Sequence, residues 1–332
     1  MNKPTASTIS LSFVIPLYKT EKTISILVDR LLGLEIAEPW EVIFVDDGSP
    51  DNTYIEIKKY LSIVDLNATL VRHTKNFGEH QAVVTGYRHS RGDYVVNIDD
   101  DLQNPPEEAI KLWSKARNND LDAVYADFSH HKKHSYWRNL GSRFANKTAQ
   151  YLLNLKEPIY LASFRCLSRP VANHIADCPS PFVYIDGLVV QFTSNIGTVP
   201  VRHDPRQVGI SNYNLKRLIG LWLVIVTGFS VAPLRFASVI GLIVLALTTI
   251  GILLILAEVL IVGATVPGWV SIMTALFFFG GLQCFVLGIL GEYVGRIFLT
   301  VSGKPQSAVK TVDIFPTPPP GTQNSDTPLG NN

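Results

Sequence analysis

Short apolar runs alternate with segments of helical periodicity over the first 130 or so positions of the chain. Val, Ile, Phe and Leu are concentrated at positions 11–17, 41–47, 68–73, 93–99 and 121–127. Between the first two runs, apolar residues recur at the three- and four-residue spacing that lines one helix face: Ile24, Leu27, Val28, Leu31 and Leu32. Strands alternating with helices are typical of a parallel sheet covered on both faces. The pattern therefore predicts an α/β domain.

The second half of the chain contains two long apolar segments. Residues 236–257 and 259–291 carry no charged side chain, and Gly263 and the Pro267-Gly268 pair break the second of these segments. Because a membrane span needs about 20 apolar residues, we expect a transmembrane hairpin over 233–302. Arg235, Arg296, Lys304 and Lys310 flank the two apolar segments, and neither Lys nor Arg occurs in the connection between them. The positive-inside rule then predicts a multi-pass protein of the inner (cytoplasmic) membrane, with the first domain and both termini in the cytoplasm.

Three further divisions follow from composition. Residues 1–212 form the cytoplasmic domain. Residues 213–232, with Lys216, Arg217 and Trp222 among apolar positions, favour an amphipathic helix lying in the membrane interface, although 218–233 could instead be a third span. The tail at 303–332 is rich in Pro, Gly, Thr and Asn, which predicts disorder.

The overall composition agrees with a membrane part joined to a soluble part. In 332 residues, 47% are hydrophobic and 17% charged, while 29 Lys and Arg balance 28 Asp and Glu. This balance argues against nucleic acid as a partner. The polar N-terminus has no apolar core of a signal peptide. Three widely spaced cysteines, Cys166, Cys178 and Cys284, fit neither a disulfide framework nor a metal cage.

Three consecutive acids follow the fourth apolar run. Asp99 and Asp101 flank one residue, so both carboxylates can reach a hard divalent cation that in turn holds a diphosphate. A solvated acidic loop is the alternative. In open α/β sheets, ligands bind beyond the carboxyl ends of the strands. Asp46 and Asp47 end an earlier run, so we expect these acids to converge on one crevice, which favours the metal site.

Four segments resemble a known family. They are Val-Ile-Pro-Leu-Tyr at 14–18, Val-Asp-Asp-Gly-Ser at 45–49, Asp-Asp-Asp-Leu-Gln-Asn-Pro-Pro-Glu at 99–107 and Gly-Glu-Tyr-Val-Gly-Arg at 291–296. Together with the hairpin, they resemble the polyprenyl-phosphate glycosyltransferases, inverting enzymes with the Rossmann-like GT-A fold. The resemblance implies transfer of a sugar from a nucleotide sugar, expected to be UDP-linked, to undecaprenyl or dolichyl phosphate.

The resemblance also implies roles for individual residues. The donor nucleotide would contact Pro16, Tyr18, Glu21, Asp47 and Asp99. Mg²⁺ or Mn²⁺ would bind Asp99 and Asp101, and the catalytic group would comprise Asp100, Asp101 and Arg206. The lipid phosphate would contact Arg138, Ser142, Arg202, Arg206 and Ser211. The chain departs from relatives at Thr20, where Glu is frequent, at Ser163, where Asp is frequent, and at Asn212, where Lys is frequent.

The basic stretch around Arg202 and Arg206 also carries an argument of its own. Arginine forms bidentate hydrogen bonds to phosphate oxygens, and this stretch precedes the predicted membrane surface. It could bind the lipid phosphate, anchor the domain to anionic lipid heads, or do both. A phosphate monoester has a second pKa of about 6 and is mostly dianionic near pH 7, so a strong general base is unnecessary. Asp100 is then the weaker candidate for a base or a sugar contact.

Two other functions remain open. A processive polysaccharide synthase would share the nucleotide domain, but no Arg-Trp pair of its Gln-x-x-Arg-Trp segment occurs in the chain. A non-catalytic membrane scaffold could retain the fold, although the intact Asp99 and Asp101 count against it. We expect a homo-oligomer whose partners are the nucleotide sugar, the polyprenyl phosphate and the membrane.

Overall fold

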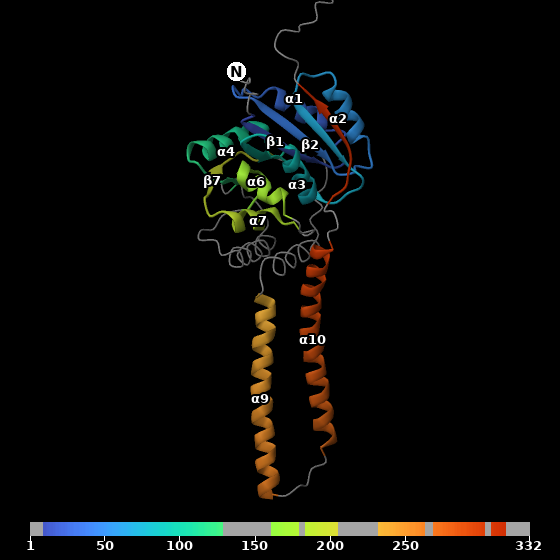
Figure 1. Cartoon of the computed structure of the whole chain (residues 1–332), viewed down its shortest axis with the longest axis vertical. Coiled ribbons are helices and arrows are strands. Elements are labelled where there is room, and N and C mark those ends of the chain that lie inside the picture. Colours follow the sequence, from blue (N-terminus) through green and yellow to red (C-terminus); the bar gives the residue numbers. More distant parts are fainter. Residues whose placement is uncertain are drawn as a thin grey trace, which may run out of the picture.

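The computed structural model describes residues 9–128, 161–178, 183–204, 232–262, 268–302 and 307–316. An α/β domain lies at one end of the molecule, and two long helices extend from it side by side (Figure 1). The strands are β1 (Leu11–Leu17), β2 (Trp40–Asp46), β3 (Ala68–His73), β4 (Tyr94–Asn97), β5 (Ala123–Asp127), β6 (Arg165–Ser168), β7 (Ile196–Pro200) and β8 (Val309–Phe315).

The described helices of the domain are α1 (Ile24–Leu32), α2 (Thr53–Leu61), α3 (Glu79–His89), α4 (Pro106–Asn118), α6 (Arg169–Ala176) and α7 (Ile185–Phe192). The five apolar runs predicted from the sequence correspond to β1 through β5. Pro105 and Pro106 begin α4, where a missing backbone N–H costs nothing, and Glu107 and Glu108 lie in its first turn, at the positive end of the helix dipole.

All the strands in the described residues belong to one eight-stranded sheet with the order β7-β5-β6-β4-β1-β2-β3-β8. β1 pairs in parallel with both β2 and β4, and β2 pairs in parallel with β3. β6 and β8 run antiparallel to their neighbours, so the sheet is mixed where the sequence predicted a parallel one. The order 3-2-1-4 reverses at β1, and ligands of such sheets bind at this switch point.

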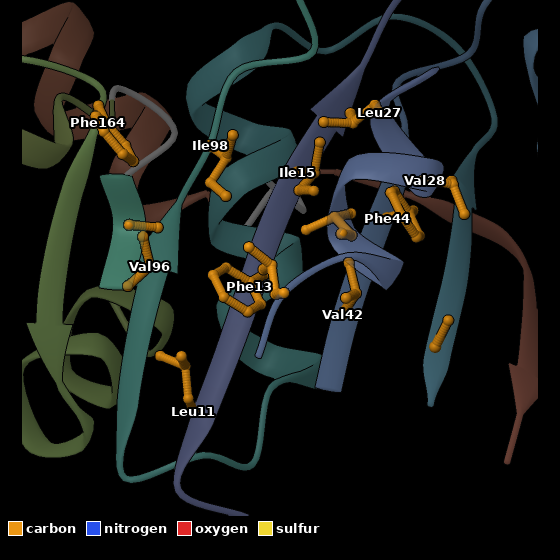
Figure 2. Close-up of a cluster of buried hydrophobic side chains, with 14 of the residues drawn as sticks. Leu11, Phe13, Ile15, Leu27, Val28, Val42, Phe44, Val96, Ile98 and Phe164 are labelled. Carbon is orange, nitrogen blue, oxygen red and sulfur yellow. The ribbon is translucent and has the colours of Figure 1, made fainter. Parts of the chain in front are cut away.

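The core lies on both faces of the sheet because successive strand residues point to opposite sides. Phe13 and Ile15 of β1 pack with α1, α2 and α4 on one face (Figure 2). Val14 of β1, with Ile43 and Val45 of β2, packs with α3, α6 and α7 on the other. The continuous burial of β1 explains why all its residues except Ser12 are apolar.

Two helices, α9 (Ala232–Val262) and α10 (Trp269–Val301), are long and apolar enough to cross a membrane. Their most apolar windows have mean hydropathies of 2.0 and 1.7 and are almost entirely unburied by the rest of the protein. α9 ends just before Gly263 and α10 begins just after Gly268, where the sequence predicted the turn of the hairpin. The expected interfacial helix at 213–232 falls, apart from its last residue, outside the described residues.

The tail corrects one expectation. The sequence predicted disorder from residue 303 onward, but Val309–Phe315 form β8 and pair antiparallel with β3. Asp313 accepts hydrogen bonds from Tyr54 and Lys58 of α2, and the Lys58 Nζ to Asp313 Oδ1 distance is 2.6 Å. The chain therefore returns from the second long helix into the sheet of the first domain.

Candidate functional site

The ends of β1 and β4 meet at the switch point of the sheet. Beyond β4 lie Asp99, Asp100 and Asp101, all partly exposed. The backbone N–H of Tyr18, just beyond β1, donates a hydrogen bond of 3.0 Å to Asp100 Oδ2. Lys19 and Leu102 adopt left-handed conformations, with φ of 61° and 60°. Such strained residues are frequent at functional sites, where the surrounding structure holds them in place.

Asp99 is held by two neutral donors. Ser163 Oγ donates to Asp99 Oδ2 at 2.6 Å, and Asn104 Nδ2 donates to the same oxygen at 3.0 Å. Asp101 Oδ1 accepts from the backbone N–H of Gln103 at 3.1 Å. These contacts orient both carboxylates through uncharged donors.

Two of these acids, Asp99 and Asp100, have raised pKa values. Burial, followed by the charge of Glu79, raises the pKa of Asp99 to about 7. Burial, opposed by the hydrogen bond from Tyr18 and assisted by Asp99 and Asp101, raises the pKa of Asp100 to about 7. Raised carboxyl pKa values mean that the protein alone stabilises the charged forms poorly. A positive group at this position would favour them.

The residues present fit a hard divalent cation such as Mg²⁺ or Mn²⁺. Carboxylate oxygens are the ligands such ions prefer, and Mg²⁺ in particular is held by one or two carboxylates together with substrate phosphates and water. Among the described residues, no three His, Cys, Asp or Glu side chains are grouped so that they could hold a metal by themselves. The arrangement thus fits a metal shared with a phosphate ligand and does not fit a closed structural site.

Asp47 lies at the end of β2 and points into the loop between β3 and α3. Its Oδ1 accepts from His73 Nδ1 at 2.8 Å and from the Phe77 N–H at 2.9 Å, and its Oδ2 accepts from the Gly78 N–H at 2.8 Å. Asp47 therefore shapes the loop beside the candidate nucleotide site. Its expected contact with the nucleotide stays a prediction.

Gly48 brings the loop after β2 against the loop after β3. Its φ is +62°, and a Cβ at this position would lie 2.5 Å from the carbonyl carbon of Lys75. Only glycine fits both the conformation and the close approach.

The other residues expected to contact the donor, Pro16, Tyr18 and Glu21, differ in how exposed they are and in what they contact. Pro16 is buried in β1 opposite Val45, whereas Tyr18 is 42% exposed. Glu21 accepts a hydrogen bond of 3.0 Å from the Asn52 N–H at the start of α2. Of these three, Tyr18 offers the most surface to a ligand.

The described part of the basic stretch lies against the loop that carries Asp101. Asp204 N–H donates to the Gln103 carbonyl at 2.9 Å, and His203 Nδ1 lies 3.2 Å from Asn104 Oδ1. Arg202 has its Nε 3.2 Å from Asp204 Oδ1 and its side chain is 55% exposed. The expected acceptor residues Arg138, Ser142, Arg206 and Ser211 lie outside the described residues.

Sequence reasoning missed a buried polar group behind Asp99. Arg165 and Asp186 form an ion pair at 2% and 6% exposure, and Tyr125 OH donates to Asp186 at 3.2 Å. Tyr87 OH donates to Asn97 Oδ1 at 2.7 Å on the same side of the sheet. Arg165 lowers the pKa of Asp99, although less than burial raises it. The sequence signal was a charged residue, Arg165, at the start of a short β-forming run at 165–168.

Comparison with known proteins places these features in context. Residues 12–176 match the model of the family described as "Glycosyl transferase family 2". The chain is 31% identical over 317 residues to an undecaprenyl-phosphate 4-deoxy-4-formamido-L-arabinose transferase of Pectobacterium carotovorum, covering 93% of this chain and 95% of that protein. A transferase of the same name from Shewanella sediminis is 32% identical over 307 residues, covering 91% and 92%.

Among solved structures, the domain is similar to glucosyl-3-phosphoglycerate synthase of Mycobacterium tuberculosis, determined with Mn²⁺, UDP and phosphoglyceric acid. The TM-score is 0.46 at 18% identity, covering 66% of this chain and 76% of that one.

Proposed function

Because this chain belongs to glycosyl transferase family 2, and within it to the polyprenyl-phosphate glycosyltransferases, we propose that it moves a sugar from a UDP-linked donor to undecaprenyl phosphate with inversion. The first candidate for the sugar is 4-deoxy-4-formamido-L-arabinose, since the relatives that match nearly the whole chain are named for it. Such full-length similarity favours lipid glycosylation over processive polysaccharide synthesis and over a scaffold without activity.

The observation that carries the proposal is the position of Asp99 and Asp101 at the switch point of the sheet. Both carboxylates accept hydrogen bonds from neutral donors, and burial raises the pKa of Asp99 although Arg165 opposes this rise. A bound Mg²⁺ or Mn²⁺ would supply the charge that stabilises the departing nucleoside diphosphate. The side chains of Asp99 and Asp101 would hold it there.

The remaining chemistry consists of positioning and electrostatics. The acceptor is a phosphate monoester that is mostly dianionic near pH 7, so it can attack without a strong base. Asp100 is tied to the Tyr18 N–H, which fits a role in joining the ends of β1 and β4 better than a role in proton transfer. Arg202 and Arg206 would orient the lipid phosphate toward the far face of the sugar.

Location follows from the two long helices. The chain is a membrane protein with the hairpin α9–α10, and we place the catalytic domain on the cytoplasmic side, where nucleotide sugars are available. A homo-oligomeric state remains a prediction.

The test is reconstitution of the full-length protein with undecaprenyl phosphate, a divalent cation and a panel of UDP-sugars that includes the 4-formamido-arabinose. Mass spectrometry of the lipid should show one new sugar-phosphate species for one donor. Loss of that species in EDTA would support the metal. Hydrolysis of the donor without any glycosylated lipid, or elongation beyond one sugar, would contradict the proposal.

A further inference from the structure

A line of hydrogen bonds connects Asp47 to the segment that follows the second membrane helix. Asp47 Oδ1 lies 2.8 Å from His73 Nδ1, and His73 Nε2 lies 2.9 Å from Thr85 Oγ1. Thr85 Oγ1 in turn lies 2.9 Å from Ser307 Oγ. The four residues come from the end of β2, the end of β3, the middle of α3 and the start of the final segment.

The direction of these bonds follows from the chemistry of the groups. An ionised carboxylate only accepts hydrogen bonds, so His73 donates to Asp47 through Nδ1. In the tautomer with its proton on Nδ1, the imidazole accepts at Nε2 from the Thr85 hydroxyl, which can accept from Ser307. Each donor then fixes the orientation of the next, ending at Asp47.

Three of the four residues in this line of hydrogen bonds are buried. Asp47 is 3% exposed, while His73 and Thr85 are each 1% exposed. A buried polar group that loses its hydrogen-bond partner destabilises the protein more than the same loss in water would. Each buried member is therefore strongly held to one orientation. Ser307 lies at the open end, where it completes the set.

The final segment is attached to β3 where β3 ends. Thr74 N–H donates to the Ala308 carbonyl at 2.9 Å, and His73 lies opposite Val309 after a register shift between Arg72 and His73. The shift falls at the residue that contacts Asp47. Since α10 ends at Val301, only a short connection separates the membrane helix from Ser307.

We propose that Ser307 and His73 are positioning residues for the donor nucleotide, and that the segment after the second membrane helix completes the nucleotide site by holding Asp47 through Thr85. This inference rests on the proposed function and on the contact between Asp47 and the nucleotide that the sequence predicts. It makes donor binding depend on a segment more than two hundred residues away in the sequence. The segment that follows the membrane helix would thereby be part of the nucleotide site.

A positioning role differs from simple stabilisation in its kinetics. Asp47 would hold the nucleotide equally in the ground state and the transition state, because the nucleotide portion does not change during transfer. Loss of its orientation should then raise the KM for the donor and leave kcat unchanged. General loosening of the fold would instead lower the active fraction and hence the apparent kcat.

The experiment uses the full-length protein in nanodiscs, with UDP as the binding probe. Ser307→Ala should weaken UDP binding and raise the donor KM by about fivefold, the factor expected for one hydrogen bond, with kcat and the lipid KM within about twofold. Ser307→Thr, which retains the hydroxyl, should recover the affinity. Thr85→Val should reproduce the loss, and combining it with Ser307→Ala should add little, because both act through one line of bonds.

Thr311→Ala is the matched control. Thr311 lies on the same segment, and its hydroxyl is 3.1 Å from Tyr54 OH on the opposite side of β8 from Thr85. Its removal should leave UDP affinity unchanged. If Thr311→Ala weakened UDP binding as much as Ser307→Ala, the inference would be overturned. It would also be overturned if Ser307→Ala left UDP affinity unchanged, or if Thr85→Val did.

Asp47→Asn separates the inference from the proposed function. If Asp47→Asn weakens UDP binding while the Ser307 and Thr85 variants do not, only the positioning role is wrong. If Asp47→Asn leaves UDP binding unchanged, the nucleotide role of Asp47 and the inference fail together. Lipid glycosylation by the unaltered protein tests the reaction itself, independently of both.

Discussion

Ser163 donates a hydrogen bond of 2.6 Å to Asp99 from the segment just before β6. The sequence had marked this position only as a departure from relatives that often carry Asp. A hydroxyl here orients the Asp99 carboxylate without adding another negative charge beside Asp101 and Glu79. The departure is therefore compatible with a working acidic site.

Asp101→Asn should abolish metal-dependent turnover while leaving the protein folded. Losing a ligand that helps to neutralise a diphosphate costs several kcal/mol in the transition state, which corresponds to at least about 100-fold in rate. The measurement is lipid glycosylation over a Mn²⁺ titration, with thermal melting as the control for folding. Near-normal turnover that still requires the metal would refute the ligand assignment.

Ser163→Ala should weaken the apparent Mn²⁺ affinity by about tenfold, the lower end of the effect of removing a partner that orients a metal ligand. The matched control is Ser168→Ala at the other end of β6, where the hydroxyl donates to Asp122 Oδ1 at 3.2 Å. Mn²⁺ titration of turnover should separate the two variants. An equal effect of both would show that Ser163 acts only on the stability of β6.

Gly48→Ala should destabilise the domain and weaken nucleotide binding together. The left-handed conformation costs about 1–2 kcal/mol for a residue with a Cβ, and a Cβ would also approach the Lys75 backbone to 2.5 Å. Gly33→Ala is the comparison, because Gly33 has φ of −78° and its Cβ would meet only ordinary contacts of 3.6 Å and beyond. The melting temperature and the UDP affinity should both fall for Gly48→Ala and should both stay unchanged for Gly33→Ala.

Much of the catalytic half could be predicted from the sequence because its signals are local. Five buried strands appear as apolar runs, and Asp99 follows one of them directly. β8 could not be predicted, because its partner β3 lies more than two hundred residues earlier and β8 itself is a short, mostly exposed strand. β6 was missed for a related reason: Arg165 is buried only because Asp186 arrives from α7 to pair with it.

Both ends of the hairpin should lie on the same side of the membrane. β8 and β3 belong to one sheet, so the chain must cross the membrane an even number of times between β7 and β8. A third span at 218–233 would separate β8 from its partner. Reporter fusions at the C-terminus and at Thr265 should therefore report opposite sides, cytoplasmic and non-cytoplasmic respectively. The same side for both would contradict the hairpin.

Arg206 should serve the lipid phosphate and not the nucleotide. The chain at Asp204 is bonded to Gln103 in the loop after Asp101, and Arg206 follows two residues later. Arg206 also leads into the chain that enters the membrane at α9. A phosphate on a membrane-embedded lipid must approach from that direction.

Arg206→Ala should therefore raise the KM for undecaprenyl phosphate sharply while UDP binding stays close to normal. Arg206→Lys should recover only part of the loss, because an ammonium keeps the charge but cannot form two parallel hydrogen bonds to one phosphate. Asn212 stands where relatives often have Lys, so fewer cations share the task and the dependence on Arg206 should be greater here. Glycosylation assays with the reconstituted protein at varied lipid concentration measure the KM for undecaprenyl phosphate, and UDP titration measures nucleotide binding. Loss of UDP binding with an unchanged lipid KM would require the donor and acceptor assignments to be exchanged.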